Sequence, residues 1–309
     1  MNNVIKVLEI IAPIFATIAL GALAKKKNTI SDEANAGLQQ FVMNFCLPCV
    51  LFNSCLTASF GMESVTAMVL LLPLVLLSSV WSFKAGKKRY PYHNLPQLFS
   101  AQETGMLGIP LFMTLFGTAQ AYRMGILDLA QNFVAIPVIA ILSTNTGKNP
   151  SVGYVAKKVF QSPLLLMSLL GLTLNLTGAA DILNAIGIGS VITEVTGFVA
   201  QPVSAVILFC VGYNFSLDRG NRKRVFEICG LHLAVLAAIC VIIQAALCFV
   251  PSVVVETRWA VLLYCALPSS YLAAGLGRTK EESGIAASVC SILTVVCLAV
   301  FCLMAVIVA

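Results

Sequence analysis

The sequence predicts an all-α integral membrane protein with ten transmembrane helices, built as two inverted five-helix repeats with crossed, broken helices 4 and 9. Three observations predict this class. Of the 309 residues, 59% are hydrophobic and only 10% are charged, whereas soluble domains contain about 25% charged residues. The chain also contains long charge-free runs, and prolines and glycines recur at matching places in its two halves. A soluble enzyme is excluded, because such a surface could not be kept in water.

The predicted helices follow from the length of the apolar runs. A membrane helix needs about 20 mostly apolar residues, because the hydrocarbon layer is about 30 Å thick and each helical residue rises about 1.5 Å. No charged residue lies between Glu33 and Glu63, and similar gaps occur in both halves. The ten predicted segments are 4–24, 38–57, 65–83, 97–117, 124–143, 160–178, 191–213, 226–249, 258–277 and 283–307.

The basic residues indicate the orientation of these segments. Sixteen of the 19 Lys and Arg residues follow odd-numbered segments, and only Lys6, Arg123 and Arg258 lie on the other side. Because cytoplasmic loops are enriched in Lys and Arg, we expect both termini outside the cell and the chain in the inner, or plasma, membrane. The net charge of +6 therefore indicates topology and contact with membrane lipid. It does not indicate a partner nucleic acid.

The two halves share a pattern of prolines and glycines. The matched positions are Pro13 and Pro163, Gly21 and Gly171, Pro48 and Pro202, and Gly117 and Gly277. Because each unit contains five segments, an odd number, the two copies are expected to have opposite orientations in the membrane. We predict a first repeat over residues 1–145, a second over 158–309 and a short cytoplasmic linker over 146–157.

The fourth and ninth segments each contain an interruption, at Gly105–Pro110 and at Pro268–Ser270. A proline removes an amide donor and clashes with the carbonyl four residues earlier. Exposed backbone at membrane depth is tolerated only where protein or a water-filled cavity satisfies it. Inverted repeats with interrupted helices are the architecture of secondary transporters, whose sites lie where the broken helices meet. A simple kink against a neighbouring helix is the alternative for either site alone.

A crossing of the two interruptions would bind an anion. The half-helices beginning near Pro110 and Ser269 would direct their amino-terminal amides to one point. A helix amino terminus stabilises an anion by about 0.3–1 kcal/mol, and by up to about 2 kcal/mol when partly buried. We therefore predict a small organic anion as substrate, bound without a metal or cofactor. The candidate substrate-binding residues at the crossing are Gln102, Glu103, Thr104, Gly105, Pro110, Pro268, Ser269, Ser270 and Tyr271.

Polar side chains elsewhere in the segments give further candidates. We expect Glu103 to be protonated when substrate is bound, which would couple transport to a proton; a structural Glu bonded to loosened backbone amides is the alternative. Asp128 and Asn132 lie one turn apart and form either a structural pair or part of the site. Asn53 either lines a cavity or joins two helices. His232, alone in its segment, is expected to pack or to cap a helix.

No enzymatic pattern is present. The 11 cysteines lie mostly inside apolar segments, and the CxxC at Cys46–Cys49 surrounds a proline and is read as packing. The sequence contains no HExxH, no GxSxG and no paired aspartate motif. We therefore expect no enzyme activity. A receptor or scaffold would not need two broken helices.

Five stretches of the sequence resemble the auxin efflux carrier family, including its bacterial members assigned to malate or malonate. They are LQQFVMNFCLPCVLF, QETGMLGIPLFMTLFG, ILDLAQNF, PLLLMSLLGL and CALPSSYLAAGLGRTKEESGIAASVCSILTVV. The resemblance extends over essentially the whole chain. It implies ten helices in two inverted repeats, a scaffold domain, and a transport domain that contains the crossed helices and moves like an elevator with a carboxylate substrate.

The sequence differs from plant members of that family at one informative position. Plant members have an asparagine and a threonine shortly before GIPL, and the resemblance implies that this asparagine contacts substrate. Glu103 stands at the matching position here, which argues against auxin and favours a protonatable site. The nearest alternative is a sodium-coupled organic anion symporter of the related bile-acid type. The sequence leaves the direction of transport, the choice of proton or sodium, and a homodimer open.

Overall fold

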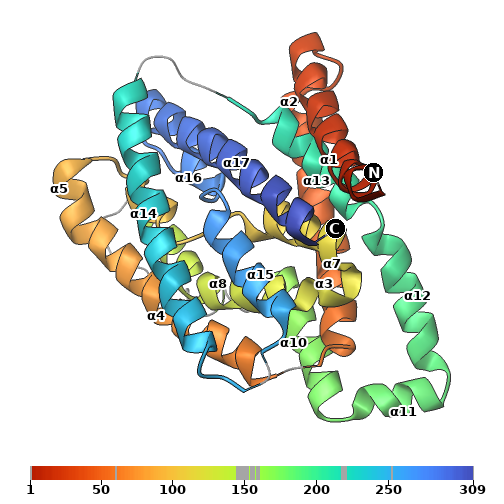
Figure 1. Cartoon of the computed structure of the whole chain (residues 1–309). Coiled ribbons are helices and arrows are strands. Elements are labelled where there is room, and N and C mark those ends of the chain that lie inside the picture. Colours follow the sequence, from red (N-terminus) through yellow and green to blue (C-terminus); the bar gives the residue numbers. More distant parts are fainter. Residues whose placement is uncertain are drawn as a thin grey trace.

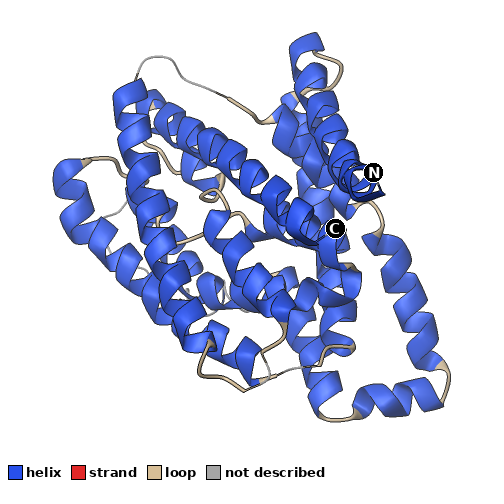
Figure 2. Ribbon diagram, viewed as in Figure 1, coloured by secondary structure: helices blue, strands red, loops and turns tan. Residues whose placement is uncertain are grey.

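The computed structural model describes residues 2–59, 61–143, 153, 157, 161–216, 221–251 and 253–308. Within these ranges the chain is helical and contains no strand, which confirms the predicted all-α class (Figure 2). Six helices are long and apolar enough to span a membrane, and a pair bent by 80° is a seventh candidate. The larger number of ten spans stays a prediction. Most of the predicted linker, 146–157, lies outside the described residues.

Eight α-helices lie in the described part of the first half of the chain. They are α1 (Asn2–Lys27), α2 (Asp32–Phe41), α3 (Leu47–Leu56), α4 (Met62–Trp81), α5 (Lys87–Arg89), α6 (Leu95–Leu98), α7 (Ile109–Phe116) and α8 (Ala121–Ser143). Shorter turns join several of them. These are the π turns Val42–Cys46, Ser82–Gly86 and Thr104–Gly108 and the 3₁₀ turn Thr118–Gln120.

The described part of the second half contains eight further α-helices. They are α10 (Pro163–Leu176), α11 (Ala179–Ala185), α12 (Ile188–Ala200), α13 (Val203–Tyr213), α14 (Arg222–Leu247), α15 (Val255–Ala266), α16 (Leu272–Gly275) and α17 (Lys280–Val308). Pro163 begins α10, and Pro202 stands directly before α13. Both prolines lie where a helix amide has no intrahelical acceptor to lose.

The helices form two groups (Figure 1). The first helix group contains α1, α2, α3, α10, α12 and α13, in which α1 packs along α13 and α10 packs along α3. The second helix group contains α4, α6, α7, α8, α14, α15, α16 and α17, in which α4 packs on α8 and α14 packs on α4, α15 and α17. The predicted fourth and ninth segments both lie in the second helix group.

Two of the matched glycines allow close helix packing in the first helix group. A Cβ atom on Gly21 of α1 would lie 1.9 Å from the carbonyl oxygen of Phe209 in α13. A Cβ atom on Gly171 of α10 would lie 2.5 Å from the carbonyl oxygen of Phe52 in α3. Small residues of this kind let helix backbones approach within membranes. The two glycines therefore have equivalent roles, as a duplicated unit would require, although the repeat itself stays a prediction.

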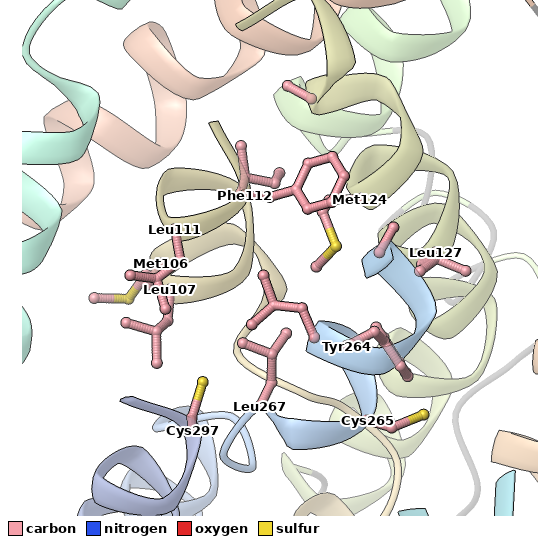
Figure 3. Close-up of a cluster of buried hydrophobic side chains, with 14 of the residues drawn as sticks. Met106, Leu107, Leu111, Phe112, Met124, Leu127, Tyr264, Cys265, Leu267 and Cys297 are labelled. Carbon is pink, nitrogen blue, oxygen red and sulfur yellow. The ribbon is translucent and has the colours of Figure 1, made fainter. Parts of the chain in front are cut away.

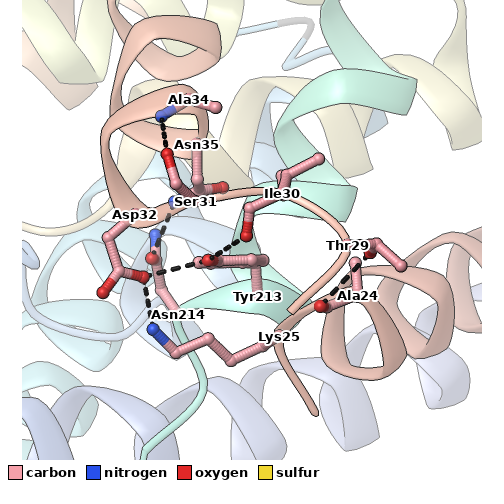
Figure 4. Close-up of polar contacts among 10 residues, drawn as sticks. All are labelled: Ala24, Lys25, Thr29, Ile30, Ser31, Asp32, Ala34, Asn35, Tyr213 and Asn214. Carbon is pink, nitrogen blue, oxygen red and sulfur yellow. Dashed lines mark hydrogen bonds and ion pairs between the residues drawn. The ribbon is translucent and has the colours of Figure 1, made fainter. Parts of the chain in front are cut away.

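A polar cluster joins the ends of α1, α2 and α13 (Figure 4). The Tyr213 hydroxyl lies 2.9 Å from Asp32 Oδ1 and 3.0 Å from the Ile30 carbonyl oxygen. The Lys25 ammonium pairs with the same Asp32 carboxylate, and its hydrogen bond lowers the Asp32 pKa. Three basic residues end α1 at this point, in keeping with the predicted cytoplasmic side.

Candidate functional site

Helix is interrupted in both predicted segments, at the predicted residues in the ninth segment but not in the fourth. In the fourth segment, α6 ends at Leu98 and helix resumes at Thr104. Gly105–Pro110, predicted as the interruption, is helical, and this prediction is wrong by about five residues. Pro110 lies in the first turn of α7, where a proline is tolerated because its missing amide has little effect.

In the ninth segment, α15 ends at Ala266, and α16 begins at Leu272 and contains only four residues. The interruption therefore includes the predicted Pro268–Ser270. A helix dipole is the sum of its aligned peptide units, so a four-residue helix contributes little of the anion stabilisation predicted for this half. In the fourth segment, the longer helical run Thr104–Phe116 remains the candidate for stabilising an anion.

The two interruptions meet in an antiparallel backbone pairing. Gln102 and Ser269 form the bridge. The Glu103 amide donates to the Pro268 carbonyl at 2.8 Å, and the Ser270 amide donates to the Ala101 carbonyl at 3.0 Å. Each broken segment therefore gives hydrogen-bond partners to backbone groups of the other that have none within a helix. A buried, non-helical backbone requires such partners.

Glu103 closes this pairing with its side chain. The Tyr271 amide donates to Glu103 Oε2 at 2.6 Å, and the Glu103 residue is only 7% exposed. The Glu103 carbonyl also accepts from the amides of Leu107 and Gly108 at 3.0 and 3.1 Å. The protein's own carboxylate thus occupies an amide that we expected to face substrate. This contact is the one that the structural interpretation of Glu103 predicts; protonation during transport stays a prediction.

Gln131 of α8 is the centre of a buried network that the sequence did not reveal. Its Oε1 atom accepts from the Gln102 amide at 2.8 Å and from the Tyr264 hydroxyl at 2.9 Å. Its Nε2 atom lies 3.0 Å from the Gln102 carbonyl oxygen and 2.8 Å from Thr104 Oγ1. One side-chain amide therefore binds both backbone groups of Gln102.

The predicted pair of Asp128 and Asn132 is formed and is joined to this network. Asn132 Nδ2 donates to Asp128 Oδ2 at 2.8 Å, and Gln131 Nε2 lies 3.0 Å from Asp128 Oδ1. Asp128 is 5% exposed. Spacing alone could have suggested Gln131, because it lies three residues after Asp128 and shares its helix face.

His232 of α14 contacts both broken segments. Its Nε2 atom lies 3.1 Å from Gln102 Oε1, and its Nδ1 atom lies 3.3 Å from Ser269 Oγ. The Ser269 hydroxyl also lies 2.8 Å from the Leu98 carbonyl oxygen. Packing or helix capping was expected for this histidine; its ring packs against Phe99 and also bridges the two halves of the crossing.

Apolar side chains surround the crossing. Met106, Leu107, Leu111 and Phe112 of the helical run Thr104–Phe116 belong to a buried cluster with residues of α8, α15 and α17, and Phe112 points toward Met124 of α8 (Figure 3). The same core also includes residues of the first helix group, such as Leu47, Val50 and Val203, so it is continuous between the two groups. On the other side, a Cβ atom on Gly105 would lie 3.2 Å from the side chains of Met43 and Leu47 in the first helix group.

Asn53 is not brought to the crossing. Its Oδ1 atom accepts from the Thr196 hydroxyl at 2.6 Å, and it lines a cavity of about 510 Å³ between α3, α7, α12 and α13. The polar residues of this cavity are uncharged; they are Asn53, Ser54, Thr57, Thr114, Thr118, Thr193, Gln201 and Ser204. Asn53 thus both lines a cavity and joins two helices, the two interpretations that its sequence position left open.

Within the described ranges, no group of three or more His, Cys, Asp or Glu residues could hold a metal ion. Comparison of the chain with known proteins gives one family. The family model described as membrane transport protein, which is the auxin efflux carrier family, matches residues 6–306. Comparison with curated proteins gives no match. The family match confirms the resemblance seen in the sequence and includes both helix groups and the crossing.

Proposed function

The chain belongs to the membrane transport protein family, the auxin efflux carrier family, and from this premise we propose that it is a secondary active carrier for small organic anions such as carboxylates. The protein is a multi-pass membrane protein of a transporter family. We further propose ten spans in two inverted repeats, a location in the inner or plasma membrane, and both termini outside, as the basic residues indicate.

The backbone pairing of Gln102 with Ser269 supports this proposal most directly. Interrupting two apolar helices removes hydrogen bonds that lipid cannot replace. Two such interruptions that satisfy each other form a fixed, polar point within an apolar bundle. Secondary carriers place their substrates at such points, whereas a structural bundle would gain nothing from them.

The amino terminus of the helical run Thr104–Phe116 is the proposed anion site. The first amides of this run, at Gly105 and Met106, have no acceptor within the helix. They can stabilise a carboxylate by up to about 2 kcal/mol when partly buried. The hydroxyl of Thr104, which accepts from the side-chain amide of Gln131 at 2.8 Å, adds a neutral donor beside them.

Glu103 has to change state before an anion binds there. Two unit negative charges about 5 Å apart repel by about 3 kcal/mol at an effective dielectric constant of about 20. This repulsion exceeds the stabilisation from the helix amides. We therefore propose that Glu103 takes up a proton when substrate binds, so that anion transport is coupled to proton movement.

Movement between the two helix groups would expose the anion site. Gly105 is covered by Met43 and Leu47 of the first helix group, so a carboxylate can approach its amide only after the two groups separate. The cavity of about 510 Å³ has walls from both groups, with α3, α12 and α13 on one side and α7 on the other. We propose that this cavity is the outer vestibule and that the second helix group carries the crossing past the first.

A thermal-shift screen followed by flux measurement tests the function. The purified chain is heated with mono- and dicarboxylates at pH 5.5 and 7.5, and each ligand that stabilises it is then tested for uptake into liposomes. Stabilisation should follow RT ln(1 + [L]/Kd), which is about 2.7 kcal/mol at a ligand concentration of 100 Kd.

We expect at least one carboxylate to stabilise the chain and to cross the liposome membrane. Flux that requires sodium and not a proton gradient would favour the sodium-coupled, bile-acid type of symporter. If no carboxylate stabilises the chain or crosses the membrane under any of these conditions, the anion carrier proposal is wrong.

A further inference from the structure

His232 contacts both broken segments although it belongs to neither. It lies on α14 and is 1% exposed. Its two ring nitrogens face Gln102 and Ser269, which are the two residues of the antiparallel bridge. The Phe99 ring, with its centroid 5.5 Å from that of the imidazole, covers it on one side. The imidazole is therefore held beside the backbone pairing that defines the crossing.

The number of protons determines which of these contacts can form together. The Ser269 hydroxyl has one proton, and the Leu98 carbonyl oxygen is its closer acceptor, at 2.8 Å. When the Ser269 hydroxyl donates to the Leu98 carbonyl, Nδ1 needs a proton to bond to Ser269 Oγ. Nε2 needs another proton to bond to Oε1 of the Gln102 side chain. An imidazolium has both protons. A neutral ring satisfies both contacts only after the Ser269 hydroxyl turns to Nδ1 or the Gln102 amide turns over.

No charged side chain neutralises a proton on this ring. The ion pairs of the described residues are Lys25 with Asp32 and Arg123 with Glu63, and neither includes His232. The elements packed against it carry further titratable or charged side chains. They are Arg222, Lys223, Arg224, Glu227, Cys229 and Cys240 on α14, Glu63 on α4, Glu256, Arg258, Tyr264 and Cys265 on α15, Lys280, Glu281, Glu282, Cys290, Cys297 and Cys302 on α17, and Glu103 and Tyr271 in the crossing. The neighbouring part of α4 contributes hydroxyls, one of which, on Ser78, bonds to the Phe99 carbonyl. The Glu103 carboxylate is bonded to another partner, the Tyr271 amide, at 2.6 Å.

We propose that His232 takes up a proton together with the substrate and, as an imidazolium, supplies the positive charge that a carboxylate at the crossing requires. The proposal rests on the proposed function. One proton binds a ring nitrogen when the anion binds, and the same proton leaves when the anion leaves. The crossing contains no Lys or Arg, and once Glu103 is neutral in the substrate complex, the bound carboxylate is the counterion of the buried imidazolium. Proton and carboxylate therefore stabilise each other's binding.

The first test measures carboxylate affinity against pH. For each proton that binds together with the anion, the affinity falls about tenfold per pH unit at pH values above the pKa of the group that takes up that proton. The dissociation constant of a dicarboxylate from the screen, such as succinate, is measured between pH 5.5 and 8.5 for the wild-type chain, for His232→Gln and for His232→Asn. The matched control is His93→Gln, because the chain contains two histidines and His93 bonds outside the crossing, to the Leu142 carbonyl at 2.9 Å.

We expect the plot of log affinity against pH to be shallower in the two His232 variants, by about one tenfold change per pH unit. The His93→Gln chain should keep the wild-type slope. Unchanged slopes in both His232 variants would overturn the proposal but leave the carrier function intact. If the wild-type chain binds no carboxylate at any pH, the proposed function fails and this inference fails with it.

A second measurement leaves His232 unchanged and so does not depend on the folding of its variants. In the His93→Gln chain, His232 is the single histidine, and ¹⁵N-histidine labelling gives one imidazole to follow by NMR. We expect saturating succinate at pH 6.5 to shift its two nitrogen signals to those of an imidazolium. Signals of a neutral tautomer in the saturated complex would overturn the proposal.

Discussion

Glu103 stands, in this structure, where an anionic substrate would compete with it. Its carboxylate accepts the Tyr271 amide at 2.6 Å, one of the backbone donors released by the break in the ninth segment. A carboxylate that arrives at the crossing would meet both an occupied amide and a like charge. The same residue can therefore act as a plug for the site and as the group that a proton has to neutralise.

Substitution of Glu103 by glutamine separates these two effects. The glutamine oxygen can still accept the Tyr271 amide, but the like charge is gone. We expect carboxylate affinity at pH 7.5 to rise about tenfold, which corresponds to about 1.4 kcal/mol, and its pH dependence to weaken. The measurement is the dissociation constant at pH 5.5 and 7.5. An affinity and a pH dependence that both match the wild-type chain would show that Glu103 does not titrate in transport.

Gln131 has a structural role at the same point. Replacing it with methionine, of similar length, leaves the Gln102 amide and the Tyr264 hydroxyl without their acceptor. Because a buried polar group without a partner costs about 1–3 kcal/mol, we expect a loss of about 2–4 kcal/mol in the thermal unfolding of the purified protein. The control is Asn132→Ala on the same helix, which removes one half-buried hydrogen bond and should cost about 0.5–1.5 kcal/mol. Equal losses in the two variants would contradict a central role for Gln131.

Sequence reasoning found the residues of the crossing that lie within the two broken segments, and it missed those that reach the crossing from elsewhere. Glu103 and Ser269 were identified because an interruption in an apolar run is visible in the chain itself. Gln131 and His232 are single polar residues in other helices, and nothing in their local sequence says which segment they face. His232 lies 130 positions from Gln102, so only the packing of α14 brings the two together.

At the scale of the elements, the glycines and the proline of the fourth segment predicted an interruption near its true position but not at the residues where helix is lost. The prediction placed the first interruption at Gly105–Pro110, whereas helix is lost before Thr104. Pro110 is compatible with the first turn of α7, and the π turn Thr104–Gly108 leads into that helix. A proline therefore indicated where a half-helix begins, and the unpaired segment lies on its amino-terminal side.

Close packing of α10 on α3 depends on Gly171. A Cβ atom there would lie 2.5 Å from the backbone oxygen of Phe52, and a backbone atom cannot turn away as a side chain can. We expect Gly171→Ala to lower the thermal stability of the purified chain by about 1–3 kcal/mol, as overpacking usually does. The matched control is Gly230→Ala in α14, where a Cβ atom meets nothing within 4 Å. That change should be neutral or stabilising by up to about 1 kcal/mol, and the reverse order of the two effects would contradict the packing described.

At the scale of the whole molecule, the proposed movement of the two helix groups rests on the cavity between them. Its walls come from both groups and carry hydroxyls and amides without a charge. The crossing does not open into it, because Gly105 is covered by Met43 and Leu47. A carrier caught with its site closed would have this arrangement, with a vestibule on one side and a buried site beyond it.

Filling the cavity should stop transport without unfolding the chain. We expect Thr114→Trp, which places an indole in the cavity wall, to lower carboxylate flux into liposomes at least tenfold while the thermal stability stays near that of the wild type. The comparison is Thr173→Trp on an exposed face of α10, which should leave flux within about twofold. Undiminished flux in the Thr114 variant would show that substrate does not pass through this cavity.

The composition and charge pattern were sufficient to predict a helical membrane protein, because lipid places strict limits on exposed polar backbone. Several long apolar helices could also be predicted from the lengths of the apolar runs, whereas the series of ten spans stays a prediction. The division into two helix groups could not, because it depends on contacts such as Gly21 with Phe209 and Gly171 with Phe52. Those contacts join segments of different halves.

The central claim is that an anion binds where the two broken segments pair. It is tested most directly by anomalous diffraction from crystals of the wild-type protein grown with bromosuccinate, once flux measurements show that this compound is transported. We predict a bromine peak within about 6 Å of the crossing, next to the first amides of the run Thr104–Phe116, which a carboxylate can reach by hydrogen bonds of about 3 Å. A peak confined to a site remote from Gln102 and Ser269, for a compound that the protein transports, would contradict the account.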